Sequence, residues 1–306
     1  MAYQAKHGTV ELEIRDSVAY VTLNRPKERN AINGDMQWDL NTLWPELNND
    51  RGVHVIAVTG KGSAFSDATG ETAKDTALTP VALDPIRTYE RKPDPSLAAK
   101  GIGVMPQVQG LRYVGIPDRT AGRPAKPMIV AVNGACSGLG LTFIAYADIV
   151  VCADDAHFFS ARANASEAPL EETLAMVHLG SLRSHEWLRM AYMGAKYKVT
   201  AQRAYQLGMA NEVAPKAQLM TRVAQLASYI TEASPAAVRA VVAGYWRTVS
   251  KPYQETLHIA PLDAQQARTM DGKEGYLAWD EGRKPVWPST TLFPWPPAWP
   301  PKIMKF

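Results

Sequence analysis

Cysteine is nearly absent from this sequence: only Cys136 and Cys152 occur in 306 residues. Both lie in apolar segments, which favours two buried free thiols in a reducing compartment over a disulfide or a nucleophile. Long hydrophobic runs are also missing, because the longest, around residues 128–132, is far too short to cross a bilayer. The first ten residues contain no apolar signal-peptide core. We therefore expect a cytoplasmic protein without a membrane partner.

Neither sign of charge dominates, since 33 basic and 30 acidic residues leave a net charge of +3. Without a dense run of Lys and Arg, binding to nucleic acid is not expected. The six histidines are scattered and the cysteines lack ligand spacing, so no metal site is expected. No dinucleotide-binding fingerprint follows a strand. What remains is ordinary for a soluble enzyme with one core and a smaller appendage: 46% hydrophobic and 21% charged residues.

The N-terminal third carries clear local signals. Residues 9–24 alternate apolar and polar side chains, which predicts a β-hairpin. Apolar residues recur at helical spacing over 36–47, with Asn33 or Asp35 placed to cap the helix. Pro45 lies inside that pattern, so a kink or an early end is expected there.

The centre of the chain alternates buried strands and turns. Continuous apolar runs predict strands at 53–60, 127–134, 148–153 and 156–159, and a helix that opens at Gly138 and runs through Ala147. Between them, residues 72–125 lose all periodicity and are rich in proline and glycine, which predicts an atypically long loop. Such loops inside a domain are usually functional.

The C-terminal third is predicted to be helical. Helices are expected at 182–194, 200–208, 216–233 and 235–250, with Thr200 as an N-cap, Gly208 as a C-terminal stop and Pro235 in a first turn. From residue 286 to residue 306 proline and tryptophan dominate. Proline at that density predicts an extended tail on a surface, packed against another subunit.

Four segments together resemble one family. They are VTLNRPKERNAIN (21–33), the block from Lys126 to Phe158, MGAKYKVTAQRAYQLGMANEV (193–213) and WDEGRKPVW (279–287). In this order, and over roughly residues 8–287, they are similar to the crotonase (enoyl-CoA hydratase/isomerase) superfamily. The resemblance implies an α/β fold, with a spiral ββα core over 1–200, a helical trimerisation region over 201–285, and the tail. It also implies a homotrimer or a dimer of trimers.

The resemblance further implies an oxyanion hole for an acyl-CoA thioester. Two main-chain N–H groups aimed at one carbonyl oxygen stabilise the negative charge of an enolate. One donor position of the family falls on Thr69 and the other on Leu139, in the turn Gly138-Leu139-Gly140. The family's usual A-G-A-D is replaced here by Asp67-Ala68-Thr69-Gly70, which alters the loop sequence at the first donor.

Coenzyme A would enter as part of the substrate, and no separate cofactor is implied. By the same resemblance, the residues expected at the CoA side are Arg25, Lys27, Arg29, Ala31, Ala68, Arg283 and Lys284. A basic turn exposed to solvent is the alternative interpretation for the first three cations.

The two carboxylates that hydratases of this family use are absent. Their positions are occupied by Thr142 and Arg162, so ordinary hydration of an enoyl-CoA is not expected. Candidate replacements for the acid/base are Glu167, Glu171 and Glu172, although glutamates in a first helical turn also serve simply as partners of the helix dipole.

Three functional interpretations stay open. The first is a lyase or isomerase that stabilises a thioester enolate with a nonstandard acid/base. The second is a β-diketone C–C hydrolase of the same fold that does not use CoA. The third is a non-catalytic acyl-CoA-binding paralogue, which the loss of both carboxylates keeps open.

Overall fold

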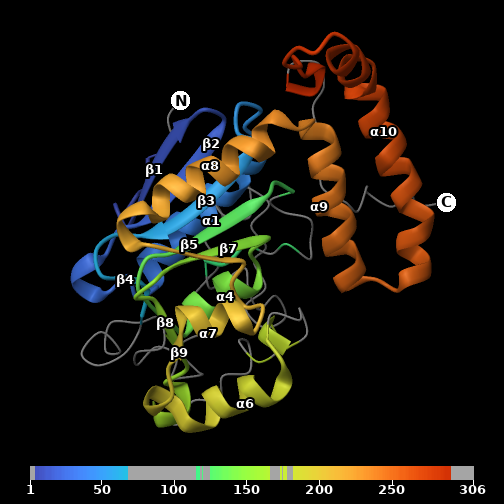
Figure 1. The fold of residues 1–306 in the computed structure, drawn as a ribbon. Helices are drawn as coiled ribbons and strands as arrows, with labels where there is room; N and C mark the ends of the chain where they lie inside the picture. The colour runs from blue at the N-terminus through green and yellow to red at the C-terminus, as the bar shows by residue number, and fades with distance from the viewer. Residues whose placement is uncertain are drawn as a thin grey trace, which may run out of the picture.

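Two β-sheets frame the molecule, as the computed structural model shows for residues 4–67, 115–117, 119, 125–165, 173, 175–177 and 182–290 (Figure 1). The first sheet contains, in this spatial order, β1 (Val10–Arg15), β2 (Val18–Leu23), β3 (Val55–Gly60), β5 (Met128–Val132), β7 (Ile149–Ala153) and β10 (Glu212–Ala214). The second sheet contains β4 (Ala64–Ser66), β6 (Ala135–Ser137), β8 (His157–Phe159) and β9 (Val199–Thr200).

The chain alternates between these sheets. The pairs β3–β4, β5–β6 and β7–β8 each place their first strand in the six-stranded sheet and their second in the four-stranded sheet. Within each sheet these strands are parallel, whereas β1 with β2 and β8 with β9 are antiparallel. Helix α4 (Leu139–Ala145) follows β6. This alternation is the ββα spiral expected from the sequence.

Helix α1 (Gly34–Asn49) links β2 to the parallel strand β3. The Asn33 side chain accepts a hydrogen bond from the Met36 amide, so Asn33 is the N-cap. Of the kink or early end expected at Pro45, the early end does not occur, because the helix continues for four more residues. Burial of Leu43, Trp44 and Leu47 on both sides of the proline explains this: each contributes about 1.5–3 kcal/mol, together more than the roughly 3 kcal/mol that an internal proline costs.

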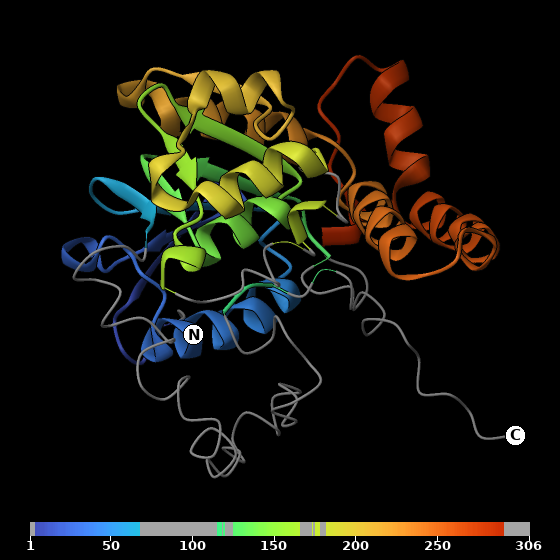
Figure 2. The same cartoon turned by 90° about the horizontal axis from the view of Figure 1, so that it is seen from below.

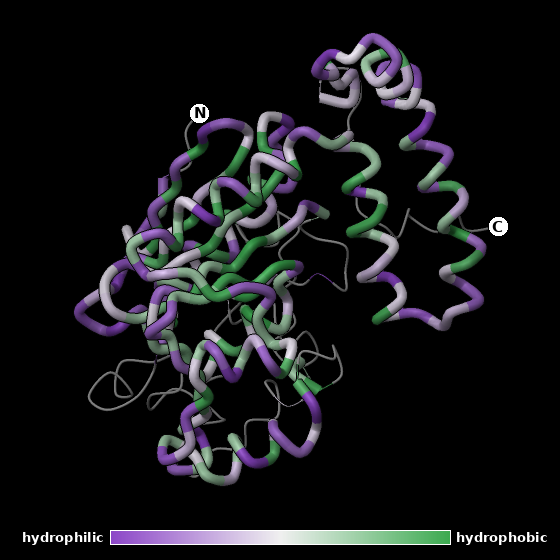
Figure 3. Tube along the Cα trace, in the orientation of Figure 1, coloured by the Kyte–Doolittle hydropathy of each residue, from purple (hydrophilic) through white to green (hydrophobic). Residues whose placement is uncertain are grey.

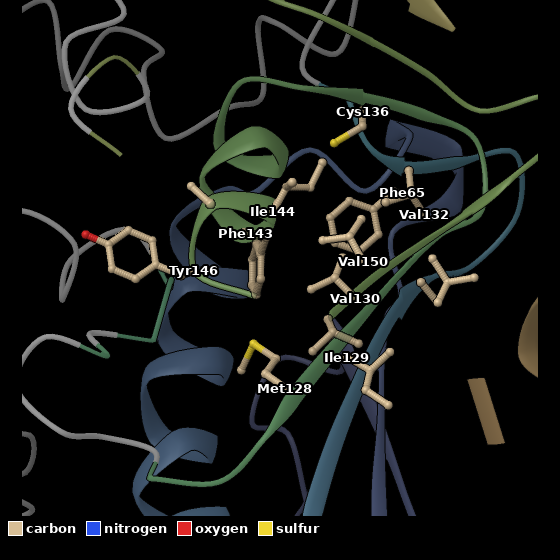
Figure 4. Close-up of a cluster of buried hydrophobic side chains, with 14 of the residues drawn as sticks. Phe65, Met128, Ile129, Val130, Val132, Cys136, Phe143, Ile144, Tyr146 and Val150 are labelled. Carbon is tan, nitrogen blue, oxygen red and sulfur yellow. The ribbon is translucent and has the colours of Figure 1, made fainter. Parts of the chain in front are cut away.

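The main core lies between the six-stranded sheet and the elements on its two faces. Figures 1 and 2 show α1 and α8 (Leu219–Glu232) on opposite faces of this sheet. Figure 4 shows Phe143 of α4 facing the side chains of β5 and Phe65 of β4, and the two phenylalanine rings meet edge to face at 5.9 Å. The hydropathy colouring shows the same concentration of apolar residues along the central strands (Figure 3).

The remaining helices are α6 (Ser184–Met193), α7 (Ala201–Gln206), α9 (Pro235–Ser250) and α10 (Tyr253–Asp280). Short 3-10 helices are η1 (Pro26–Glu28), η5 (Arg162–Ala165), η6 (Gly194–Lys196), η7 (Lys216–Gln218) and η8 (Pro288–Thr290). The predicted caps hold: Thr200 accepts from the Arg203 amide, Gly208 has a φ of 77°, and Pro235 occupies a first-turn position. Helix α10 lies within the helical region expected over 201–285, although no separate helix was predicted after residue 250. In the described part of the chain, no helix combines the length and apolarity needed to cross a membrane.

Elements beyond residue 200 also pack on the six-stranded sheet. Strand β10 pairs with β7, and α8 lies against β3, β5 and β7, so residues up to Glu232 belong to the core. From Ser234 onward, α9 and α10 form an antiparallel pair that extends from the core (Figure 1). Trp246 of α9 holds this pair to the core by stacking on Tyr146 at 5.5 Å and donating its indole N–H to Asp148.

The beginning of the expected extended tail is folded instead. Pro288–Thr290 form η8, because the Ser289 amide and hydroxyl both donate to the Asp271 carboxylate on α10, at 2.9 and 2.7 Å. Residues 291–306 and most of the predicted loop 72–125 lie outside the described residues.

Candidate functional site

The turn that follows β2 contains the basic residues expected at the CoA side. Pro26–Glu28 form η1, and Arg29 and Asn30 follow with φ values of 53° and 57°. The Arg25 guanidinium donates to the carbonyl of Ala31 at 2.5 Å, and Ala31 itself is fully buried. Arg25 therefore closes the turn on itself. Lys27 is exposed and makes no ion pair within the described residues.

Two buried asparagines fasten this turn to the start of the second sheet. Asn30 accepts from the Arg25 amide and donates to the carbonyls of Lys61 and Ala64, at 2.9 and 2.8 Å. Asn133 accepts from the Gly60 amide and donates to the carbonyl of Ala64 at 3.2 Å. Both side chains thus converge on the Ala64 carbonyl, which fixes β4 relative to the turn and to the end of β5.

Strands β4 and β6 are neighbours, and in the sequence each leads into one of the two candidate donor loops. The strands are parallel and adjacent, so their carboxyl ends lie side by side. Asp67 follows β4 and Ser137 ends β6, and the Ser137 hydroxyl donates to Asp67 at 2.7 Å. The Arg29 guanidinium lies 2.5 Å from the second oxygen of the same carboxylate. Asp67 and Ser137 were not identified as site residues from the sequence, although Ser137 directly follows the apolar pair Ala135-Cys136 and Asp67 comes two residues after the apolar pair Ala64-Phe65.

Leu139, the predicted second donor, is the first residue of α4. Gly138 before it has a φ of 55° and a ψ of −129°, a conformation that favours glycine. The first amides of a helix have no partner inside it. Among the described residues, the Leu139 amide donates no hydrogen bond, while the Leu141 amide donates to the Gly138 carbonyl. One of the two expected N–H groups is therefore available in this turn.

Thr142 and Arg162, the residues that the resemblance aligns with the usual hydratase carboxylates, both lie among the described residues. Thr142 lies on α4 and is fully buried, and within the described residues its hydroxyl has no hydrogen-bond partner. Arg162 begins η5 and is partly buried. Thr69, Ala68, Glu167, Glu171 and Glu172 lie outside the described residues, so their roles stay predictions.

At the C-terminal end, Arg283 is held by carboxylates. Its guanidinium meets both oxygens of Glu274, at 2.6 and 3.0 Å, and one oxygen of Glu281 at 2.5 Å. Hydrogen bonds from Arg283 and from the Val286 amide lower the pKa of Glu274 to about 2. Lys284 is almost fully exposed and lies 3.7 Å from Glu232. Any contact of these two cations with CoA stays a prediction.

Both cysteines are free and buried, as predicted. Burial raises the pKa of the Cys136 thiol well above its usual range and that of Cys152 to about 12. Because the thiolate is the nucleophile, neither sulfur is suited to covalent catalysis. Within the described residues, no group of three His, Cys, Asp or Glu side chains is arranged to hold a metal ion.

Known proteins resemble the chain over most of its length. The sequence model of the family described as "Enoyl-CoA hydratase/isomerase" matches residues 13–82 and 121–290. Hydroxycinnamoyl-CoA hydratase-lyase of Pseudomonas fluorescens is 25% identical over 89% of this chain and 91% of the relative. Mevalonyl-coenzyme A hydratase of Aspergillus fumigatus is 29% identical over 90% of this chain and 93% of the relative.

Solved structures agree with the sequence relatives. An enoyl-CoA hydratase/isomerase from Mycobacterium paratuberculosis superposes with a TM-score of 0.73 at 28% identity, covering 91% of this chain and 97% of the other. An enoyl-CoA hydratase from Mycobacterium tuberculosis superposes with a TM-score of 0.71 at 25% identity, covering 91% and 98%. With the spiral of strands and the position of the Leu139 turn, these matches show that the chain belongs to the enoyl-CoA hydratase/isomerase (crotonase) superfamily.

Proposed function

We propose that this protein processes an acyl-CoA thioester by polarising its carbonyl between the amides of Leu139 and Thr69. The available Leu139 N–H carries the proposal, because it lies where β4 and β6 end together. Relatives described as a hydratase-lyase and as a hydratase of CoA thioesters support the substrate class. Coenzyme A is then part of the substrate, and no separate cofactor is needed.

The reaction differs from two-carboxylate hydration. A carboxylate that activates water must reach the substrate, whereas Thr142 offers only a buried hydroxyl and Arg162 a cation. A lyase or isomerase reaction through a thioester enolate fits this pair better, with an acid/base supplied by Glu167, Glu171 or Glu172. Each glutamate is tested by substitution with glutamine; if none lowers turnover more than about tenfold, the acid/base lies elsewhere.

The role of the Leu139 amide is tested by replacing Leu139 with proline, which has no main-chain N–H. Proline is tolerated at the first position of a helix, where its missing N–H would have no helical partner. Leu139→Pro therefore removes the donor and keeps α4, while Leu139→Ala removes the same side chain and keeps the donor. The measurement is exchange of the α-protons of butyryl-CoA for deuterium, followed by NMR.

Loss of one oxyanion donor typically costs about 10²–10³ in rate. Leu139→Pro is expected to lose activity on that scale, and Leu139→Ala less than about tenfold. Equal losses in the two variants, at equal melting temperatures, contradict the proposed oxyanion hole.

A thermal-shift comparison with CoA, acetyl-CoA and crotonyl-CoA separates the remaining interpretations. Stabilisation by all three supports a CoA site, and indifference to all three favours the β-diketone hydrolase. The loss of both usual carboxylates favours the non-catalytic paralogue as a second candidate. It predicts stabilisation by the thioesters together with no proton exchange.

We also infer that α9 and α10 contact further copies of the chain in a homotrimer or a dimer of trimers. A largely apolar groove of about 800 Å³ runs between these helices. Its rim exposes Val241, Tyr276 and Trp279, the last with 89% of its surface accessible. Light scattering of wild type and Trp279→Glu tests this: the variant is expected to have a lower mass, and a monomeric wild type contradicts the inference.

A further inference from the structure

A buried polar cluster joins the three segments that meet at the candidate site. Asp67 is fully buried after β4, Ser137 is 2% exposed at the end of β6, and Arg29 lies in the turn after β2. The Ser137 hydroxyl and the Arg29 guanidinium each bind one oxygen of the Asp67 carboxylate, at 2.7 and 2.5 Å. The Asp67 amide also donates to the Arg29 carbonyl at 3.0 Å. We call these three residues the Asp67 cluster.

The Asp67 cluster stabilises the fold no more effectively than apolar side chains of the same size would. Removing a carboxylate from water costs several kcal/mol, and well-packed apolar residues of the same size are often equally stabilising. What apolar residues lack is direction, since a hydrogen-bonded carboxylate fixes its neighbours at one distance and one angle. The surroundings already contain apolar contacts in abundance, including Phe65 and Cys136, both fully buried. The cluster therefore points to a need for precise placement.

The segments it connects are those that the proposed oxyanion hole requires. Asp67 precedes Thr69 by two residues, and Ser137 precedes Leu139 by two residues. The hydrogen bond between their side chains therefore ties the end of β4 to the start of the Leu139 turn. Catalytic groups must be held within about 0.5 Å of their productive geometry, and an error of about 1 Å can cost a hundredfold in rate.

Resting on the proposed function, we propose that Asp67, Ser137 and Arg29 are positioning residues that set the spacing of the two oxyanion donors. Asp67 is too deeply buried to touch the substrate, so it acts through the turns. Arg29 has a second task. It neutralises the Asp67 carboxylate, whose negative charge would otherwise oppose the charge that develops on the substrate oxygen.

This assigns Arg29 a role different from a contact with CoA phosphates. The two roles predict different results with a chromophoric probe, 4-dimethylaminocinnamoyl-CoA, whose absorption band moves to longer wavelength when its carbonyl is polarised. The size of that red shift at saturation reports polarisation, and the titration midpoint reports affinity. A residue that only binds phosphate changes the midpoint and leaves the saturated shift intact.

The test compares wild type with Ser137→Ala, Ser137→Thr and Arg29→Met. Ser137→Ala removes the hydroxyl and is expected to lower the saturated red shift by at least half, with the midpoint changed less than about tenfold. Ser137→Thr retains a hydroxyl and is expected to recover most of the shift. Arg29→Met leaves the buried Asp67 carboxylate without its cation, so it is expected to lower the melting temperature and to lower the red shift as Ser137→Ala does. If Ser137→Ala does not fold, Arg29→Met decides, with the red shift read at a temperature below its own melting transition.

Two results overturn the positioning role of these residues but leave the proposed oxyanion hole standing. One is a full red shift in Ser137→Ala or Arg29→Met when wild type shows one, and the other is an equal loss in Ser137→Thr and Ser137→Ala. Absence of any red shift in wild type, by contrast, overturns the proposed function and this inference together.

Discussion

Lys126 provides a quantitative test of the packing at the start of β5. It is 1% exposed, and its ammonium group donates to the main-chain carbonyls of Leu47 and Asp50. Burial lowers the pKa of Lys126 to about 7, helped by repulsion from Arg239 and opposed by attraction to Asp50. An unfolded chain restores the pKa to about 10.4. Between these two values the unfolded state binds more protons than the folded state, so stability must rise with pH.

The magnitude follows from the two pKa values. At pH 7 the folded side chain is half protonated and the unfolded one fully protonated, and by pH 9 the folded one has lost its proton. Integration over this range gives a gain of about 2 kcal/mol in the free energy of unfolding. From pH 6 to pH 7 the same treatment gives less than about 0.5 kcal/mol.

Urea unfolding of wild type and Lys126→Met at pH 6, 7, 8 and 9 measures this contribution. The difference between the two proteins isolates Lys126, because the buried thiols have raised pKa values in both and destabilise both above pH 8. Wild type is expected to gain about 2 kcal/mol relative to Lys126→Met between pH 7 and pH 9. Substitution of the exposed Lys216 by Met should leave the slope unchanged. Parallel pH profiles for wild type and Lys126→Met would refute the reasoning.

Three further substitutions test the packing around the candidate site, each read from urea unfolding at pH 7. Gly134→Ala places a Cβ 2.0 Å from the carbonyl oxygen of Ser63, so it is expected to lower the free energy of unfolding by about 3 kcal/mol. A decrease below about 1 kcal/mol contradicts this expectation. Thr142→Val removes a buried hydroxyl without a partner, so it is expected to be neutral or stabilising by about 1 kcal/mol, and a clear loss argues that the hydroxyl is bonded. Trp246→Phe keeps the ring against Tyr146 but removes the hydrogen bond to Asp148, at an expected cost of about 1–2 kcal/mol, and an unchanged midpoint contradicts that role.

Much of the fold is readable from local sequence signals. The alternation in residues 9–24 gives the hairpin of β1 and β2, and Asn33 and Thr200 cap the helices they were expected to cap. These features depend on neighbours within a few residues, which is why periodicity and capping chemistry reveal them. The turn at Gly138 is also predicted by its sequence, because glycine adopts positive φ readily, and Gly138 has a φ of 55°.

Other features depend on distant contacts and leave no local pattern. Strands β9 and β10 are two and three residues long and exist because β8 and β7 offer unpaired edges. Helix α10 has a weakly amphipathic sequence interrupted by Pro261, and its partner is α9 rather than the core. The length and periodicity of the local sequence do not predict such elements, because tertiary packing supplies their stability.

The basic turn after β2 shows why the sequence alone does not assign binding residues. Arg25, Lys27 and Arg29 are equivalent in sequence as three cations within five residues. In the structure, Arg25 is committed to the Ala31 carbonyl and Arg29 to the Asp67 carboxylate, so both hold the turn in place. Lys27 is left as the exposed cation of the turn. We therefore propose Lys27 as the residue of this turn that would contact a CoA phosphate, with the two arginines holding the turn that carries it.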